Sequence, residues 1–420
     1  MKRIILIAML LITAAMMVFA GGSKEAAAET DGKTELVFWT RINDTFEEEI
    51  AAFEAAHPDV DVTRVGVGSD YDDLTTKYIA SAVSGELPHV GLVSQRYGIP
   101  QLYDAGVLVP VDELMTEEEM NDVLDAYWGR YTYKERKVAL PFQVSMPMLY
   151  VNLDLFNEYG VEIPRTWEEV IEAAHKLTID TDGDGVTDIY GFNIPSDAPW
   201  YLNGMFKAAG ADVIRSEKDV NFNQEEVVAV LETIQDLTAD GCMPSNQHSS
   251  AKDDFKNGSV AMILNSCAGN GSIAKGVGDK FEYAMVTFPS INGNIYAPLG
   301  GNGLGVFKSN PEMEALAWEF VQFMTSTEAY SGFSMNKGYM PITKSSMEED
   351  VVKARINDPF WAETYAQVSH LYGQPINPVD ATIWNSINDI LSIIEADSEA
   401  DVAALVADTQ SEIEDFLAEY

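Results

Sequence analysis

The chain has 420 residues, of which 46% are hydrophobic, and it carries a formal net charge of −41 at pH 7. This length predicts two domains, and the apolar content is too high for a disordered chain. Such a negative charge argues against binding to nucleic acid or to anionic membranes, because those surfaces would repel the protein.

The N-terminus has the pattern of an export signal. Lys2 and Arg3 precede an apolar run, and Ala20 provides a small residue before Gly21. This predicts a signal peptide over residues 1–20, with a short transmembrane anchor as the alternative. Residues 21–33 are rich in Gly, Ala, Ser and charge and predict a flexible leader. No Cys follows the cleavage point, so we expect a periplasmic or secreted protein without a lipid anchor.

An alternation of strands and helices follows the leader. Apolar periodicity predicts strands over 35–39, 60–67 and 89–94 and helices over 45–57, ending before Pro58, and over 71–83. This order predicts a parallel sheet with helices on both faces, which binds ligands beyond the carboxyl ends of its strands.

A second run of elements begins near Pro141. A capping box of Thr166 and Glu169 predicts the start of a helix that runs to about residue 177. Asn310 and Pro311 predict the start of another helix, through residue 324. Strands are predicted over 149–151, 260–264, 283–288 and 303–307, and the end, 381–420, is predicted to be helical throughout.

The motifs of common enzyme classes are absent from the sequence. It has no nucleophile elbow, zincin motif or P-loop, and its five histidines are scattered. The glycine run from Gly301 to Gly305 precedes a strand and indicates a close backbone approach at a cleft. Cys242 and Cys267 form no disulfide framework, and their pairing is left open. We expect no enzymatic activity, although 67 carboxylates leave a glycosidase pair open.

One loop has the spacing of a calcium site. Asp180, Asp182, Asp184 and Asp188 occupy positions 1, 3, 5 and 9, with Gly185 at position 6. Gly191 stands at position 12, where a bidentate Glu is expected. The loop therefore predicts either a structural Ca²⁺ site or an Asp/Gly-rich turn whose carboxylates accept hydrogen bonds from its own backbone.

Several short motifs, in their order along the chain, resemble the extracellular solute-binding family 1 of ABC importers. This family includes maltose-binding and glycerol-3-phosphate-binding proteins. The motifs are Leu36–Trp39, Pro141–Phe142, Pro147–Asn152, Pro164–Glu169, Gly300–Gly301, Ala317–Phe320 and Gly338–Pro341.

The resemblance implies an α/β, two-lobed periplasmic-binding-protein fold. Each lobe would be a mostly parallel sheet flanked by helices, with the ligand cleft between the lobes. Residues 34–143 and 290–338 would form lobe 1, and residues 144–289 and 339–420 would form lobe 2. The family's members capture carbohydrates for an ABC permease, so we expect that partner, a monomer, no required cofactor and no catalysis.

The resemblance also implies which residues contact the ligand. Departures from the family are Ala268, at a position where maltose-type members have a stacking Trp, and the lack of a phosphate-binding Arg around 376–388. The alternative for the three tryptophans, Trp39, Trp200 and Trp384, is a core position. For Arg41 and Arg96 it is a surface charge. The expected ligand-binding residues are Trp39, Arg41, Asn43, Tyr71, Gln95, Arg96, Ser145, Trp200, Ser266, Gly301, Tyr339 and Trp384.

Three other functions stay open. A binder of glycerol-3-phosphate or another anionic polyol would need Arg41 and Arg96 aimed at the anion. A secreted carbohydrate-active hydrolase would turn over oligosaccharides. A calcium-dependent adhesion or sensor protein would lack a small-molecule pocket.

Overall fold

The computed structural model describes residues 32–95, 98–216 and 218–419. The predicted signal peptide, most of the leader and Arg96 lie outside this part. Within it, no helix is both long enough and apolar enough to cross a bilayer.

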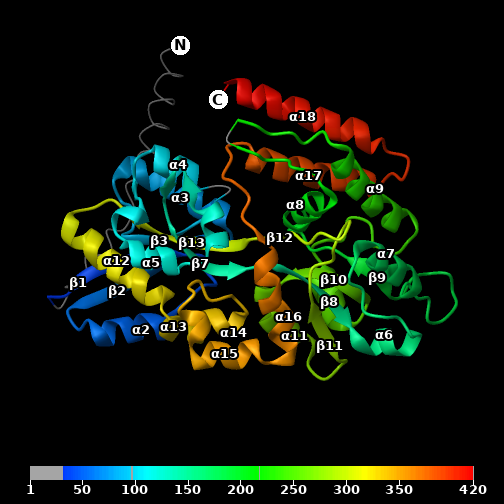
Figure 1. Cartoon of the computed structure of the whole chain (residues 1–420), viewed down its shortest axis with the longest axis horizontal. Coiled ribbons are helices and arrows are strands. Elements are labelled where there is room, and N and C mark those ends of the chain that lie inside the picture. The colour runs from blue at the N-terminus through cyan, green and yellow to red at the C-terminus, as the bar shows by residue number, and fades with distance from the viewer. Residues whose placement is uncertain (1–31, 96–97, 217, 420) are drawn as a thin grey trace, which may run out of the picture.

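The first sheet has six strands from distant parts of the sequence (Figure 1). Their order is β2-β1-β3-β13-β4, and β7 pairs with β13. β1 is parallel to β2 and β3, whereas β13 is antiparallel to β3, β4 and β7, so one strand runs against the others. The bounds are Thr34–Thr40 (β1), Val60–Gly66 (β2), Val90–Val93 (β3), Leu108–Val109 (β4), Leu140–Ser145 (β7) and Gly300–Phe307 (β13).

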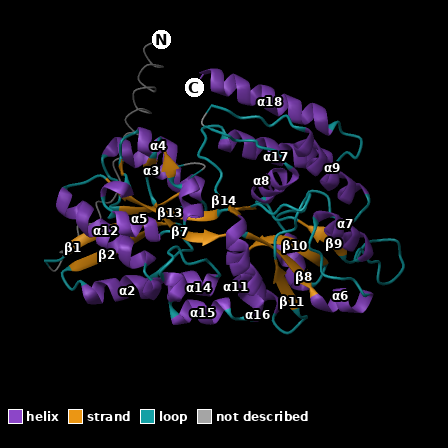
Figure 2. Cartoon of the chain, viewed as in Figure 1, coloured by secondary structure: helices purple, strands orange, loops and turns teal. Residues whose placement is uncertain are grey.

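Helices cover this sheet on both sides (Figure 2). Asp70 caps α3 by accepting from the backbone N–H groups of Asp72 and Asp73, and Gly85 ends it at φ 75°. In the core, the ring of Phe38 lies 5.8 Å from Phe46 and 5.2 Å from Phe320, which joins β1 to α2 and α12. The bounds are Glu47–Ala56 (α2), Tyr71–Ser84 (α3), Ile99–Asp104 (α4), Glu117–Asp122 (α5) and Pro311–Thr325 (α12).

The second sheet has four strands in the order β11-β8-β10-β9. β8 is antiparallel to β10 and β11, and β10 is parallel to β9, so again one strand runs against the others. All six residues of β8 are buried, as expected for a central strand. The bounds are Pro147–Asn152 (β8), Tyr190–Asn193 (β9), Val260–Ser266 (β10) and Tyr283–Val286 (β11).

The helices around the second sheet include the C-terminal pair, which packs along α8 and α9 (Figure 1). The predicted capping box of Thr166 and Glu169 opens α7. The bounds are Leu153–Tyr159 (α6), Trp167–Lys176 (α7), Ala198–Ala209 (α8), Glu225–Ala239 (α9), Ala251–Asn257 (α10), Asn270–Val277 (α11), Asp380–Ile394 (α17) and Val402–Glu419 (α18).

One prediction for the C-terminus is wrong, because the helix is interrupted between Ile394 and Val402. The carboxylate of Asp397 accepts from the N–H of Glu399, and that of Asp401 accepts from the N–H of Ala404. Such side-chain bonds compete with helical ones and place the break.

The chain passes from the first sheet to the second at Met146, between β7 and β8, and returns before β13. A third connection places the N–H of Met340 2.7 Å from the carbonyl of Val144. The exact bounds of the predicted lobes remain a prediction. The remaining strands and α-helices are β5 (Thr132–Tyr133), β6 (Arg136–Lys137), β12 (Ala297–Pro298), β14 (Leu371–Tyr372), α13 (Thr327–Ala329), α14 (Met335–Lys337), α15 (Asp350–Ile356) and α16 (Pro359–Ala366).

Candidate ligand-binding cavity

A cavity of about 350 Å³ lies between the two sheets. It is lined from the first sheet's side by residues that follow β1 and β3, and from the second sheet's side by α8, the end of β10 and α17. Nine of the twelve residues expected to contact ligand line it: Arg41, Tyr71, Gln95, Ser145, Trp200, Ser266, Gly301, Tyr339 and Trp384.

On the first side, Arg41 is held by two neighbours. Its Nε donates to Asp44 Oδ2 at 2.7 Å, and its Cζ lies 4.5 Å from the centroid of the Tyr71 ring. The Tyr71 hydroxyl accepts from Asn302 Nδ2 at 2.6 Å. Burial raises the pKa of Tyr71, so the phenol keeps its proton and can donate it to a ligand.

Gln95 forms a bridge between the two sides of the cavity. Its Nε2 donates to the carbonyl oxygens of Gln374 at 3.0 Å and Pro375 at 3.4 Å, in the segment before α17. Gln374 Nε2 in turn donates to Asp380 Oδ1 at 2.9 Å. The lining is therefore already ordered by hydrogen bonds.

The second side supplies two indoles. Trp200 is 9% exposed, and its Nε1 donates to the Leu299 carbonyl at 3.4 Å. Trp384 is partly buried against the core of the second sheet. Indole rings in a cavity wall suit the C–H faces of a sugar.

The crossing strands form the floor of the cavity. Gly301 has φ +102°, and a Cβ there would lie 2.1 Å from the backbone oxygen of Gln143. The ladder of β7 and β13 shifts register between Gly300 and Asn302. The predicted close backbone approach is confirmed, and only glycine fits it.

Three expected residues do not line the cavity. Trp39 is 6% exposed and stacks on Tyr78 with ring centroids 5.4 Å apart, in the core of the first sheet. Asn43 is exposed outside the lining. Arg96 lies outside the described residues. Trp39 is adjacent to the loop that reaches the cavity, but its side chain leaves the strand on the core face.

Other polar residues that sequence reasoning did not single out also line the cavity. Lys252 Nζ lies 4.0 Å from Asp197 Oδ1. Both side-chain amide atoms of Asn265 are buried and have no partner among the described residues. Ser94, Asp197 and Asn265 lie near strand ends, which is a usable signal, and Tyr372 ends the short strand β14. The remaining ones come from loops and helices: Arg130, Asn203, Gln374 and Asp380.

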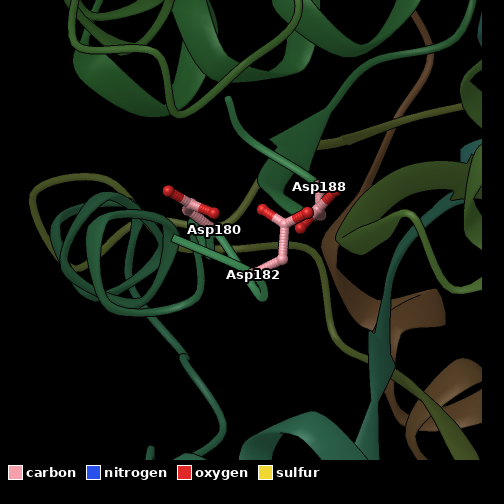
Figure 3. Close-up of side chains that lie close together, drawn as sticks. All are labelled: Asp180, Asp182 and Asp188. Carbon is pink, nitrogen blue, oxygen red and sulfur yellow. The ribbon is translucent and has the colours of Figure 1, made fainter. Parts of the chain in front are cut away.

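The predicted calcium loop lies away from the cavity. Carboxylate oxygens of Asp180, Asp182 and Asp188 lie within 4.8 Å of one another, and Figure 3 shows Asp182 between the other two. Asp184 is not in this group, and its carboxylate accepts from the N–H of Val186. Backbone N–H groups of Gly185 and Gly183 donate to Asp180 and lower its pKa.

The two cysteines are buried and free. Cys242 packs in the core of the second sheet, and Cys267 packs in the larger core that includes the first sheet.

Residues 48–359 match the family model described as bacterial extracellular solute-binding protein. A sn-glycerol-3-phosphate-binding periplasmic protein of Rhizobium meliloti is 28% identical over 345 residues, which is 77% of this chain and 78% of the relative. A maltotriose-binding protein of Pyrococcus abyssi is 22% identical, covering 91% of this chain and 82% of the relative.

Two solved structures have a closely similar fold. UgpB of Mycobacterium tuberculosis in complex with glycerophosphocholine has a TM-score of 0.79 at 21% identity. The superposition includes 92% of this chain and 99% of the UgpB chain. The maltose/maltodextrin-binding domain MalE of Bdellovibrio bacteriovorus bound to maltotriose has a TM-score of 0.76 at 19% identity, covering 92% and 100%. These likenesses confirm the predicted α/β two-lobed fold.

Proposed function

The chain belongs to the family of bacterial extracellular solute-binding proteins, and from that premise we propose that its cavity captures a carbohydrate for the permease of an ABC importer. The observation that carries this proposal is the cavity between the sheets, whose volume of about 350 Å³ lies in the range of small-ligand sites. Its two indoles, its amides and its charged side chains provide stacking faces and hydrogen bonds for sugar hydroxyls. The relatives named for maltotriose binding support the same ligand class.

A thermal-shift screen against mono-, di- and oligosaccharides and polyol phosphates tests this proposal. A ligand at 100 times its dissociation constant adds about 2.7 kcal/mol to the unfolding free energy, which raises the melting temperature measurably. If no member of the panel raises the melting temperature, the proposal is contradicted.

A glycerol-3-phosphate binder is the second candidate, because three basic side chains line the cavity: Arg41, Arg130 and Lys252. The Rhizobium meliloti relative supports it by its name. The polyol phosphates in the same panel separate this candidate from a neutral sugar binder.

The protein acts outside the cytoplasmic membrane in this proposal, after cleavage at Ala20 and without a lipid. It releases its ligand unchanged. Mass spectrometry of the mature protein from its native envelope tests the cleavage and the absence of a lipid. Chromatography of an oligosaccharide after incubation with the protein tests whether the ligand is released unchanged. A retained leader, a lipid adduct or a shortened oligosaccharide would each contradict the corresponding point.

The Asp loop is a candidate structural Ca²⁺ site. Two oxygens that bind one Ca²⁺ at about 2.4 Å can lie at most about 4.8 Å apart, and the oxygens of Asp180, Asp182 and Asp188 meet that limit. The loop would then be fixed in the second half of the molecule, away from the cavity.

A further inference from the structure

The three basic side chains of the cavity differ in how their charge is balanced. Arg41 donates to Asp44 at 2.7 Å, and Lys252 lies 4.0 Å from Asp197. Arg130, in contrast, has no carboxylate within ion-pair distance among the residues that the structure describes.

The position of the Arg130 guanidinium is fixed by the backbone. Arg130 ends the 3₁₀ turn Asp125–Arg130, and its Nη1 donates to the Leu299 carbonyl oxygen. The same carbonyl accepts from Nε1 of Trp200. Arg130 is therefore held beside an indole of the cavity wall.

The donors of Arg130 are not all used by the protein. Its Nε is buried and has no hydrogen-bond partner in the described part of the chain. A half-buried guanidinium without a counter-ion is unfavourable unless another group compensates its charge. A carboxylate or phosphate in the cavity can accept charge-assisted N–H bonds from this guanidinium and supplies the missing negative charge.

A second buried polar side chain without a hydrogen-bond partner in the described chain lies on the opposite side of the cavity. Asn265 is fully buried at the end of β10, and its Nδ2 and Oδ1 both lack partners in the described chain. An amide that offers both donors and an acceptor matches a hydroxyl, which can accept and donate. The two unsatisfied groups together match a ligand that carries an anionic group and hydroxyls.

We propose that Arg130 determines specificity by binding an anionic group, a carboxylate or a phosphate, on a polyhydroxylated ligand. This inference rests on the proposed function, since it concerns the solute held in the same cavity. It narrows the ligand class from carbohydrates in general to acidic sugars and polyol phosphates.

Isothermal titration calorimetry on the mature protein tests the inference with three kinds of probe. They are glycerol-3-phosphate for phosphate, galacturonate and its dimer for carboxylate, and maltotriose and cellobiose as neutral sugars. The wild type should bind one of the anionic probes more tightly than either neutral sugar, and this affinity should fall when KCl is raised from 50 to 500 mM. Whether glycerol-3-phosphate or galacturonate binds distinguishes the two anions.

Variants then locate the charge that is responsible. Arg130→Met should weaken binding of the anionic probe about 30-fold or more, because it removes a charge-assisted contact inside the cavity. Arg130→Lys should restore part of the affinity, since it keeps the charge and loses the fork. Arg215→Met is the matched control, because Arg215 is an exposed arginine that does not line the cavity.

The outcomes separate the inference from the proposed function. Tighter binding of a neutral sugar than of every anionic probe overturns the inference and leaves the proposed function standing. Equal binding of the anionic probe by wild type and a folded Arg130→Met variant also overturns it. Failure of the whole panel, neutral and anionic, contradicts the proposed function and the inference together.

Discussion

Trp384 supplies one wall of the cavity with an indole that is partly buried against the second core. Replacing Trp384 by Ala removes this stacking face and should weaken ligand binding about 30-fold, which corresponds to about 2 kcal/mol. Titration calorimetry with the ligand found in the screen measures the change. Trp384→Phe, which keeps a ring, should lose less affinity, and unchanged binding by Trp384→Ala would contradict the role of this residue.

His248 joins the second sheet to the C-terminal helices. Its Nδ1 lies 2.7 Å from the Ile194 carbonyl oxygen, and its Nε2 lies 2.8 Å from Oε1 of the buried Glu395. Both neighbours are acceptors, so the ring satisfies both only when it is protonated. Burial alone lowers the pKa of His248, but the Glu395 carboxylate and the Ile194 carbonyl outweigh it and raise the pKa above 6.5.

A raised pKa in the folded state has a defined effect on stability. The contribution of His248 is fully present below the unfolded pKa of about 6.5 and is lost as the pH rises through the higher folded value. His248→Gln should therefore lower the unfolding free energy by about 2 kcal/mol at pH 6 and by less at pH 9. Urea unfolding of both proteins at the two pH values measures this, and a pH-independent difference would contradict it.

Sequence reasoning located much of the cavity at the residue level and missed part of it. Gln95 could be placed because the family resemblance implied a ligand contact directly after the third predicted strand, and it lines the cavity there. Trp39 could not be placed correctly, because a strand residue faces either the core or the ligand edge, and composition does not decide which. Arg130 comes from a short turn far from the other lining residues in sequence, and no periodic pattern marks it.

At the level of elements, the bulge between β7 and β13 fixes the floor of the cavity. Gly301→Ala would place a Cβ 2.1 Å from the Gln143 backbone oxygen at φ +102°. We expect it to lower the unfolding free energy by about 2 kcal/mol or more and to weaken ligand binding. The control Gly106→Ala, at φ +70° with open space around it, should cost only about 1 kcal/mol. Equal losses of stability in the two variants, measured by urea unfolding, would contradict this account.

The loop between α7 and β9 is the element in which a metal ion is expected. Chelation should lower the melting temperature, and Ca²⁺ titration should give heat, without loss of ligand binding at low temperature. Asp182→Asn should abolish the heat, because Asp182 is in the carboxylate cluster. Asp184→Asn is the matched control outside that cluster and should retain the heat. No heat from the wild type and no effect of a chelator would show that the loop is a turn only.

The elements with strong end signals were predicted well. Asn310 and Pro311 begin α12, and Thr166 begins α7, because a cap depends on a few adjacent residues. The break between α17 and α18 was missed because apolar periodicity continues on both sides of it. It depends on a tertiary contact as well, since the Glu395 side chain is bound to the loop at Asn246 and His248.

At the scale of the whole molecule, the sequence predicted alternating strands and helices but not the pairing of the strands. β13 lies between β3 and β4 although about two hundred residues separate it from them. Such pairings depend on long-range packing, which local patterns do not contain. The resemblance to a known family supplied the two-lobed architecture, which the solved structures confirm.

The cavity is lined from both halves of the molecule, which indicates how the protein captures its solute. Gln95 lies on the first side of the cavity and Trp384 on the second, so a ligand contacts both only when the halves are close together. Ligand binding should therefore shift the equilibrium between an open and a closed form toward the closed form. The size of this shift is limited by how much more tightly the ligand binds the closed form than the open form.

Small-angle X-ray scattering of the mature protein, with and without a saturating ligand from the screen, tests this claim most directly. The radius of gyration should fall on addition of the ligand, and should stay constant with a sugar that gives no thermal shift. An unchanged radius of gyration at full saturation would contradict capture of the solute by closure of the two halves.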